Sequence, residues 1–194
     1  MQPESDRNGF EARGREALED ELLVTRCQIG EASAFDELIG RWHTPLWKYA
    51  RRVTGNDDAA AETVQEVWLR ILRGIVRLRE PGRFRPWMFG IARRVMMDRL
   101  RSAYAAPVVE SIDLSTIPEP QDSRDLELEI SNLHEELARL PVIEREVLVL
   151  FYLQELTLNE IADVLAIPAG TVKSRLFRAR HLLREQLTTK GTKR

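Results

Sequence analysis

The residues with the clearest chemical role lie between Thr157 and Arg180, where a polar cap, an apolar face and a cationic helix follow one another. Thr157 and Glu160 have the S/T-x-x-E spacing that satisfies free amides at a helix start. Pro168 suits the first turn of a second helix, because its missing N–H costs nothing there. Two helices joined by a turn of about three residues form a helix-turn-helix. This pattern predicts binding in the major groove of DNA.

The second of these helices divides into a core face and a DNA face. Val172, Leu176, Ala179 and Leu183 fall together at helical spacing and predict an apolar stripe. Lys173, Arg180 and Arg184 line one flank, which suits phosphates, whereas the polar apex is placed to reach base edges. The predicted DNA-binding residues are Thr171, Lys173, Ser174, Phe177, Arg178, Arg180 and Arg184.

Charge is segregated along the chain, although the formal net charge is only -2. Residues 83–101 hold six arginines against Asp98, and residues 169–194 hold eight lysines and arginines against Glu185. Between them, residues 107–136 hold nine acidic residues and Arg124 as the one lysine or arginine. Two basic patches around an acidic segment predict two nucleic-acid contacts and a tether that avoids nucleic acid.

The elements that must position these patches are helices, because apolar residues recur at three and four residues and no β alternation is visible. Residues 1–18 form a polar extension that we expect to be disordered or only nascently helical. Helical periodicity then runs over residues 19–105. Pro45 predicts a bend or split within it, Asn56 or Asp57 caps a further helix, and residues 79–86 form a loop.

A second helical unit follows a linker. Residues 106–124 are acidic and contain three prolines, which predicts a flexible connection. Periodicity resumes over residues 125–188, is broken at Pro141 and ends before a basic tail, residues 189–194. The predicted fold class is therefore all-α, with two small bundles, the C-terminal one containing the helix-turn-helix.

Composition excludes several classes of protein. With 43% hydrophobic and 31% charged residues in 194, and no apolar run long enough to span a bilayer, the chain predicts no membrane insertion and a cytoplasmic location. Cys27 is the single cysteine and three histidines are scattered, so neither a disulfide nor a metal site is indicated. No nucleophile-base set or phosphate-binding loop is visible, which predicts a protein that is not an enzyme and has no cofactor.

Three runs of residues carry a resemblance to a known family. They are TGNDDAAAETVQEVWLR at 54–70, WMFGIARRVMMDRLR at 87–101, and LPVIEREVL at 140–148 followed by GTVKSRLFRAR at 170–180. In this order they resemble the extracytoplasmic-function (ECF) sigma factors of bacterial RNA polymerase, within the sigma-70 family. The resemblance covers about residues 20–188 and implies that residues 19–105 are sigma region 2 and residues 125–188 sigma region 4.

The resemblance also implies roles for named residues. The residues expected to bind core RNA polymerase are Glu62, Gln65, Glu66, Trp68 and Leu69. Those expected to bind the −10 promoter element are Arg83, Arg85, Arg93, Arg94 and Arg101, and the helix-turn-helix set is assigned to the −35 element. Trp68 also fits a core position, and Trp87 fits the core better than a wedge between bases. The implied partners are core polymerase, promoter DNA and an anti-sigma factor.

Three positions depart from the family pattern. Thr63, or its neighbour Ala61, stands where an acidic residue is usual, which predicts a weaker polar contact to polymerase. Arg94 replaces an asparagine, and Ala166 replaces the turn glycine of the helix-turn-helix. If residue 166 has a positive φ, alanine there costs about 1 kcal/mol.

The sequence thus predicts a sigma factor that directs initiation at two-part promoters and assists their melting. Two alternatives remain open. One is a conventional helix-turn-helix regulator that does not bind polymerase as a sigma subunit, although that class usually carries a ligand or phosphoacceptor domain. The other is a sigma-like adaptor that binds a protein and not DNA, although it would have no use for two arginine-rich surfaces.

Overall fold

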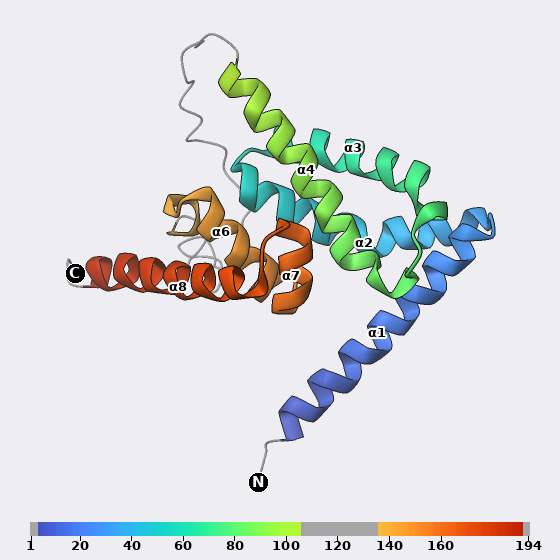
Figure 1. Cartoon of the computed structure of the whole chain (residues 1–194), viewed down its shortest axis with the longest axis horizontal. Coiled ribbons are helices and arrows are strands. Elements are labelled where there is room, and N and C mark those ends of the chain that lie inside the picture. Colours follow the sequence, from blue (N-terminus) through green and yellow to red (C-terminus); the bar gives the residue numbers. More distant parts are fainter. Residues whose placement is uncertain (1–3, 106–135, 192–194) are drawn as a thin grey trace, which may run out of the picture.

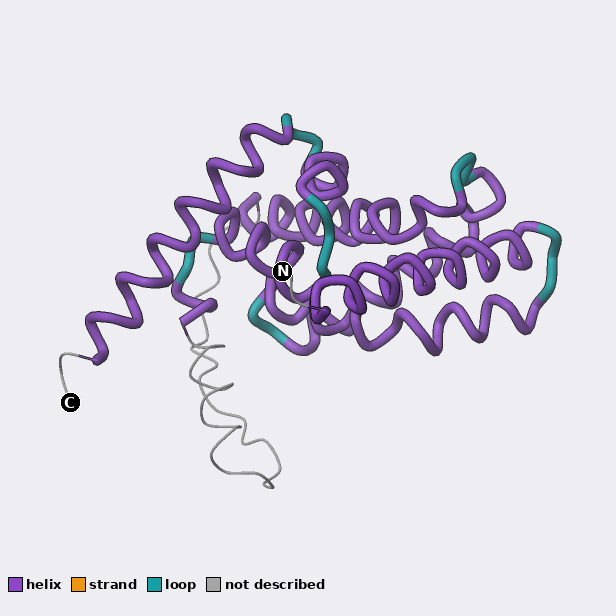
Figure 2. Tube along the Cα trace, turned by 90° about the horizontal axis from the view of Figure 1, so that it is seen from below, coloured by secondary structure: helices purple, strands orange, loops and turns teal. Residues whose placement is uncertain are grey.

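The computed structural model describes residues 4–105 and 136–191, and within those two ranges it is helical and contains no strand. The all-α prediction is therefore confirmed. Figure 1 shows an N-terminal bundle and a C-terminal bundle side by side, and Figure 2 shows that short loops join the helices within each. The predicted linker at residues 106–124 and the predicted region 4 start at residue 125 lie outside the described residues.

The N-terminal bundle consists of four long helices around an aromatic centre. They are α1 (Glu4–Gln28), α2 (Ala32–Thr54), α3 (Asp57–Gly74) and α4 (Phe84–Ala105), with 3-10 turns η1 (Ile75–Arg77) and η2 (Pro81–Arg83) before α4. The ring of Phe89 meets those of Trp42 and Tyr49 edge-on, with centroids 6.3 and 5.1 Å apart. These rings bury large apolar areas in favourable edge-to-face geometry, which fixes how α4 crosses α2.

The first helix corrects one prediction. Residues 1–18 were expected to be disordered or nascently helical, but α1 begins at Glu4 and extends away from the bundle (Figure 1). Gly9 and Gly14 lower the helical propensity of this stretch, which is why its composition gave little indication of a helix. No proline interrupts it, and ion pairs from Arg41 of α2 to Glu19 and Asp20, at 2.7 and 2.9 Å, hold it near residue 20.

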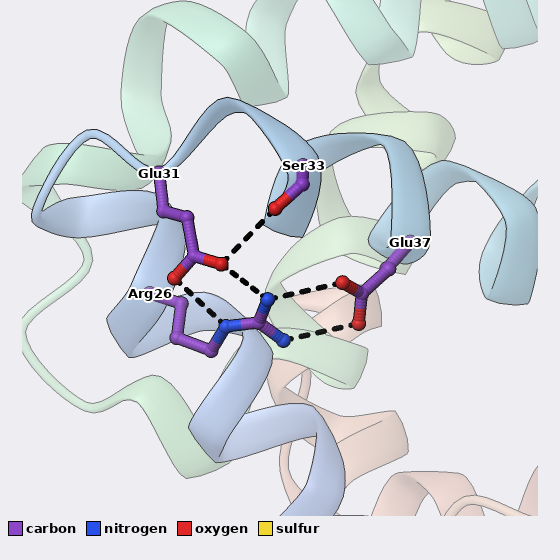
Figure 3. Close-up of polar contacts among 4 residues, drawn as sticks. All are labelled: Arg26, Glu31, Ser33 and Glu37. Atoms are coloured by element: carbon purple, nitrogen blue, oxygen red, sulfur yellow. Dashed lines mark hydrogen bonds and ion pairs between the residues drawn. The ribbon is translucent and has the colours of Figure 1, made fainter.

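Four polar residues fix the corner between α1 and α2 (Figure 3). The guanidinium of Arg26 pairs with Glu31, which precedes α2, and donates to Glu37 within α2 at 3.0 Å. Ser33 donates a hydrogen bond to Glu31 at 3.0 Å. These bonds, first from Arg26 and then from Ser33, lower the pKa of the Glu31 carboxyl to about 2. The last turn of α1 is thereby tied to the first turns of α2.

Two sequence predictions concern α2, one at Pro45 within it and one at Asn56 just after it. Of the bend or split predicted at Pro45, the split is wrong, since α2 runs without interruption from Ala32 to Thr54, and the bend stays a prediction. Trp42, Leu46 and Tyr49 are buried on both sides of the proline, so packing holds the helix together across the missing hydrogen bond. The helix ends at Gly55, which has φ +74°, and the Asn56 side chain accepts the amide of Ala59 at 2.8 Å to begin α3. The cap at Asn56 is confirmed.

The C-terminal bundle is smaller. Residues 136–139 are helical, and α6 (Val142–Leu148), a π-helical turn η3 (Val149–Leu153), α7 (Leu158–Leu165) and α8 (Ala169–Gly191) follow. The break at Pro141 is confirmed, because this residue caps α6. The predicted basic tail, residues 189–194, begins within α8, which continues to Gly191, and residues 192–194 lie outside the described residues. The buried apolar residues of the two bundles belong to one continuous cluster, with α4 packed on α7 and α2 on α6 and η3.

Candidate functional site

The helix-turn-helix has the geometry that the sequence predicts. The Thr157 hydroxyl accepts the amide of Glu160 at 3.3 Å, and the Glu160 carboxylate accepts the amide of Thr157 at 2.8 Å, so the capping box is present. The turn before Pro168 begins at Ala166, whose φ is +53°. An L residue in this left-handed conformation is strained, because its Cβ crowds the following carbonyl oxygen. Residue 166 therefore has the positive φ on which the expected cost of alanine, about 1 kcal/mol, depends.

Helix α8 presents the predicted DNA face to solvent. Val172, Leu176 and Ala179 are buried and Leu183 is half-buried, which confirms the core stripe. Phe177, on the other side, is 72% exposed. Lys173, Ser174, Arg178, Arg180 and Arg184 are also exposed, and Thr171 is half-buried.

Two arginines of that face are held by neighbouring side chains. The Arg180 guanidinium lies over the rings of Phe151 and Tyr152, 5.5 and 5.3 Å from their centroids. The Arg178 Nε lies 3.5 Å from a carboxylate oxygen of Glu144, a buried residue of α6. These contacts limit the conformers that both arginine side chains adopt.

A mainly apolar groove lies between α2 and α3 in the N-terminal bundle. Its volume is about 480 Å³, and it is lined by Phe35, Ile39, His43, Trp47, Ala61, Val64, Gln65, Trp68, Leu69 and Leu72. Trp68 is 8% exposed and meets the Phe35 ring edge-on at 6.0 Å, so it supports the floor of the groove. Leu69 is 41% exposed at its edge.

The structure brings the predicted polymerase-binding residues together on α3. Gln65, Trp68 and Leu69 line the groove, whereas Glu62 and Glu66 flank it. Glu62 pairs with Arg99 of α4, and Glu66 pairs with Arg70 one turn later at 2.7 Å. Apolar surface rimmed by paired charges is typical of a protein interface.

Thr63 does not belong to that surface. It is fully buried, and its hydroxyl donates to the backbone carbonyl of Ala59 at 2.6 Å. The idea that Thr63 weakens a polar contact to polymerase is therefore wrong, because this side chain faces the core. Ala61 is exposed and lines the groove, so of these two positions it is the one that lies on this surface.

The five arginines assigned to the −10 element fall into two groups. Arg94 and Arg101 are exposed, and Arg101 lies 3.6 Å from Asp98 within α4. Arg83, Arg85 and Arg93 face the C-terminal bundle. Arg83 pairs with Asp163 of α7, and Arg85 donates to the backbone carbonyl of Gln154 at 2.6 Å while lying over the Trp42 ring. Nothing in the spacing of these arginines predicted the second group.

A buried polar cluster joins the two bundles at Arg93. Its Nε lies 3.3 Å from a carboxylate oxygen of Glu146, a residue of α6 that is 2% exposed. The Tyr49 hydroxyl donates to the same carboxylate at 3.0 Å. Burial raises the pKa of Glu146, an effect that Arg93 and Tyr49 oppose. Burial, and then the Glu146 charge, raise the pKa of Tyr49 well above its ordinary value. One feature of the sequence could have indicated the burial of Glu146. It lies four residues before the apolar Leu150, so the two residues share a helix face, and Leu150 is buried.

A cationic pocket of about 300 Å³ lies where the two bundles meet. Its walls are formed by Leu78, Arg79, Glu80, Arg83, Pro86, Trp87, Gly90, Arg94 and Asp163. Trp87 is half-buried, and its ring approaches the backbone at Gly74 so closely that a Cβ there would lie 3.1 Å away. Trp87 is therefore both a packing residue and a pocket wall.

The described residues contain neither a metal-binding cluster nor a membrane-spanning helix. Between residues 4 and 105 and between 136 and 191, no three histidine, cysteine or acidic side chains are placed to hold a metal ion. None of the helices in these ranges is long and apolar enough to cross a membrane. Cys27 is a buried free thiol whose pKa is raised mainly by burial.

Comparison with known proteins agrees with this geometry. The Sigma-70 region 2 family matches residues 38–105, and the Sigma-70, region 4 family matches residues 130–183. The ECF RNA polymerase sigma factor SigW of Bacillus subtilis is 31% identical over 177 residues, covering 84% of this chain and 94% of SigW. SigL of Mycobacterium tuberculosis, also an ECF sigma factor, is 33% identical over 174 residues, covering 88% and 98%.

Solved structures have the same fold. CnrH, in complex with the cytosolic domain of CnrY, has a TM-score of 0.67 and 25% identity, covering 88% of this chain and 98% of CnrH. The sigma factor RpoE of Bartonella quintana, solved with the anti-sigma factor NepR, has a TM-score of 0.63 at 23% identity, covering 79% and 96%. With both sigma regions in order along its sequence, the chain belongs to the ECF sigma factors of the sigma-70 family.

Proposed function

We propose that this protein binds core RNA polymerase, directs it to promoters with −35 and −10 elements, and assists the melting of promoter DNA. The observation that carries this proposal is the pairing, in one short chain, of an exposed helix-turn-helix with a second bundle that has a separate arginine-rich face and a groove. A regulator that only binds DNA needs the helix-turn-helix but not the second bundle. The domain bounds that we propose are residues 19–105 for region 2 and 125–188 for region 4.

The groove on α2 and α3 is the proposed polymerase site. Leu69 and Trp68 supply apolar area near a polar Gln65, and the flanking Glu62 and Glu66 add charge at the rim. Aromatic and leucine side chains in a concave surface bind the apolar face of a partner helix well. We therefore assign core binding to these five residues.

Promoter contacts are assigned to the two cationic faces. Arg83, Arg85, Arg93, Arg94 and Arg101 would hold the phosphates of the displaced strand at the −10 element, with the pocket at Trp87 near them. On α8, Thr171, Lys173, Ser174, Phe177, Arg178, Arg180 and Arg184 would bind the −35 element. The acidic linker at 106–124 would pass between the two sites without competing for DNA.

Several further properties follow from this role. The protein would have no catalytic residue or cofactor of its own, since nucleotide polymerisation belongs to the polymerase. It would act in the cytoplasm, where that partner transcribes DNA. CnrH and the Bartonella sigma factor were each solved with a bound protein, which supports the proposal that an anti-sigma factor regulates this chain as well.

Run-off transcription with purified core polymerase tests the proposal. We expect transcripts from a genomic fragment library to start downstream of one shared two-part motif, and core polymerase alone to give none. If the chain binds such DNA but does not bind core polymerase, it is a conventional helix-turn-helix regulator. If it binds core or another protein and never DNA, it is a sigma-like adaptor.

A further inference from the structure

We propose that Glu144, a residue outside the helix-turn-helix, determines which base Arg178 recognises, and that this base is a guanine. The inference rests on the proposed function, because it gives a base preference to the −35 contact that we assign to Arg178. Glu144 itself does not touch DNA. It acts through Arg178 and is therefore a positioning residue.

An acidic side chain of α6 reaches the DNA face of α8 from the protein side. Glu144 lies in the first turn of α6, where the free amides of the helix start favour an acid, and α6 packs on α8. The Glu144 side chain is 8% exposed and that of Arg178 is 71% exposed, and a carboxylate oxygen of Glu144 lies 3.5 Å from the Arg178 Nε. The Nε side of the guanidinium is thus turned toward the protein, while most of the arginine side chain stays in contact with solvent.

This orientation leaves one edge of the Arg178 guanidinium for a base. The group is planar and donates hydrogen bonds from Nε and from both Nη atoms. With Nε beside Glu144, the two Nη atoms remain to donate a parallel pair of hydrogen bonds. In the major groove guanine presents two neighbouring acceptors, O6 and N7, whereas adenine presents an acceptor beside a donor and cytosine presents a donor. Guanine therefore matches the edge that Glu144 leaves available.

The charge of Glu144 also opposes the contact that competes with base recognition. An exposed arginine can bind a backbone phosphate instead of a base, and such a contact carries no sequence information. A phosphate that approaches Arg178 comes close to the Glu144 carboxylate as well, and the two anions repel each other. A base edge has no net charge and meets no such repulsion. Glu144 thus favours the base contact of Arg178 over a phosphate contact.

Arg180, two residues later on α8, has a support of a different kind. Its guanidinium lies over the rings of Phe151 and Tyr152, 5.5 and 5.3 Å from their centroids. These rings hold the flat face of the guanidinium and add no negative charge, so a phosphate can approach its edges. The two arginines are therefore supported in ways that suit different contacts, a base for Arg178 and a phosphate for Arg180.

A first measurement, on the free full-length chain, tests whether Glu144 holds Arg178. Glu144→Leu removes the carboxylate and keeps a similar volume. At a buried site such an exchange is often neutral or stabilising, so the melting temperature should not fall. Nitrogen-15 relaxation of the Arg178 Nε reports the mobility of the guanidinium, and we expect its order parameter to fall in this variant. An unchanged order parameter would overturn the holding of Arg178 by Glu144.

A second measurement, on the holoenzyme, tests the effect on DNA by selecting −35 sequences from a randomised promoter library. The position that Arg178 reads is the one whose base preference disappears in Arg178→Ala. There the parent should prefer guanine by about ten- to a hundredfold, as expected for a bidentate contact. Glu144→Leu should reduce that preference by about five- to tenfold, because the freed guanidinium also binds phosphates, and should leave the other positions of the element unchanged.

Glu144→Gln separates the charge of this residue from its shape. It keeps an acceptor near the Arg178 Nε but loses the negative charge, so the guanine preference should fall less than in Glu144→Leu. Asp58→Asn is the matched control, because it removes one carboxylate charge from an exposed site on α3, and it should leave every position unchanged. In the Arg178→Ala background neither Glu144 variant should alter the preference further, since Glu144 acts through Arg178.

A parent preference for a base other than guanine, or an unchanged preference in both Glu144 variants, would overturn the inference. An effect of Glu144→Leu that persists in the Arg178→Ala background would also overturn it, because that effect would not pass through Arg178. If the parent holoenzyme selects no −35 motif at all, the proposed function fails. The relaxation measurement uses neither polymerase nor DNA, so it still decides in that case whether Glu144 holds Arg178.

Discussion

At the scale of single residues, Ala166 is the clearest conflict between local sequence and fold. Its φ of +53° is favourable for glycine and strained for alanine. We expect Ala166→Gly to raise the free energy of unfolding by about 1 kcal/mol, measured by urea denaturation. Ala162→Gly, in the preceding helix, is the control and should lower it by about 1 kcal/mol. Equal destabilisation by both changes would show that the turn is not strained.

Residues of α8 differ in what they contribute to −35 binding. Arg178, held at 3.5 Å from Glu144, lies near the exposed apex with Phe177, and its replacement by alanine should cost about 1–3 kcal/mol on the preferred sequence alone. Lys173→Ala should weaken binding to all sequences alike and reduce the slope of log affinity against log salt by up to about one. Holoenzyme competition binding at several salt concentrations checks both. The reverse pattern would mean that α8 lies differently in the groove.

At the scale of elements, α3 separates a core face from an interface face. Val64 and Val67 are buried, whereas Gln65 is exposed and Glu66 half-buried beside the groove. We expect Gln65→Ala with Glu66→Ala to weaken binding to core polymerase by roughly tenfold, since two rim contacts of about 0.5–1 kcal/mol are lost. Circular dichroism should show an unchanged melting temperature. Asp58→Ala, exposed on the first turn of α3, is the control, and an unchanged affinity in the double variant removes this surface from the interface.

The corner between α1 and α2 predicts a defined dependence on pH. Because the folded-state pKa of Glu31 is lowered from 4.5 to about 2, its stabilising effect is fully present above pH 4.5 and is lost as pH falls toward 2. Glu31→Gln should therefore lower the melting temperature at pH 7, and the difference from the parent should shrink between pH 5 and pH 3. A difference that stays constant over that range would exclude an ionic role for the corner.

At the scale of the whole molecule, Arg93 lies between the two bundles and also belongs to the arginines proposed to bind the −10 element. It pairs with Glu146 of α6, while Arg94, one residue later, is exposed and lines the cationic pocket. On preformed holoenzyme, Arg93→Ala with Arg94→Ala should slow promoter opening by roughly tenfold and leave closed-complex formation almost unchanged, because capture of the single strand follows docking. Permanganate footprinting over time measures opening. Normal appearance of the bubble would exclude both arginines from strand capture.

Local sequence determined the elements of this protein, and several of its sites, because helices and caps depend on neighbours three or four residues away. The capping box at Thr157, the cap at Asn56, the apolar stripe of α8 and the exposed position of Phe177 all follow from spacing and residue type. Spacing and residue type did not predict that α2 continues through Pro45 or that α1 is so long. In both, packing between helices outweighed local propensity.

Only the tertiary structure decided which residues of the two bundles meet. Tyr49, Arg93 and Glu146 are separated by up to 97 residues, and no periodicity within one helix indicates a partner in another. Burial of Thr63 likewise depends on how α3 packs on its neighbours. Charge segregation along the chain indicated two basic faces, but the pairing of one of them with acids of the other bundle is a property of three-dimensional contact. Hydrogen bonds and ion pairs act over a few ångströms, so their partners are known only once the chain has folded.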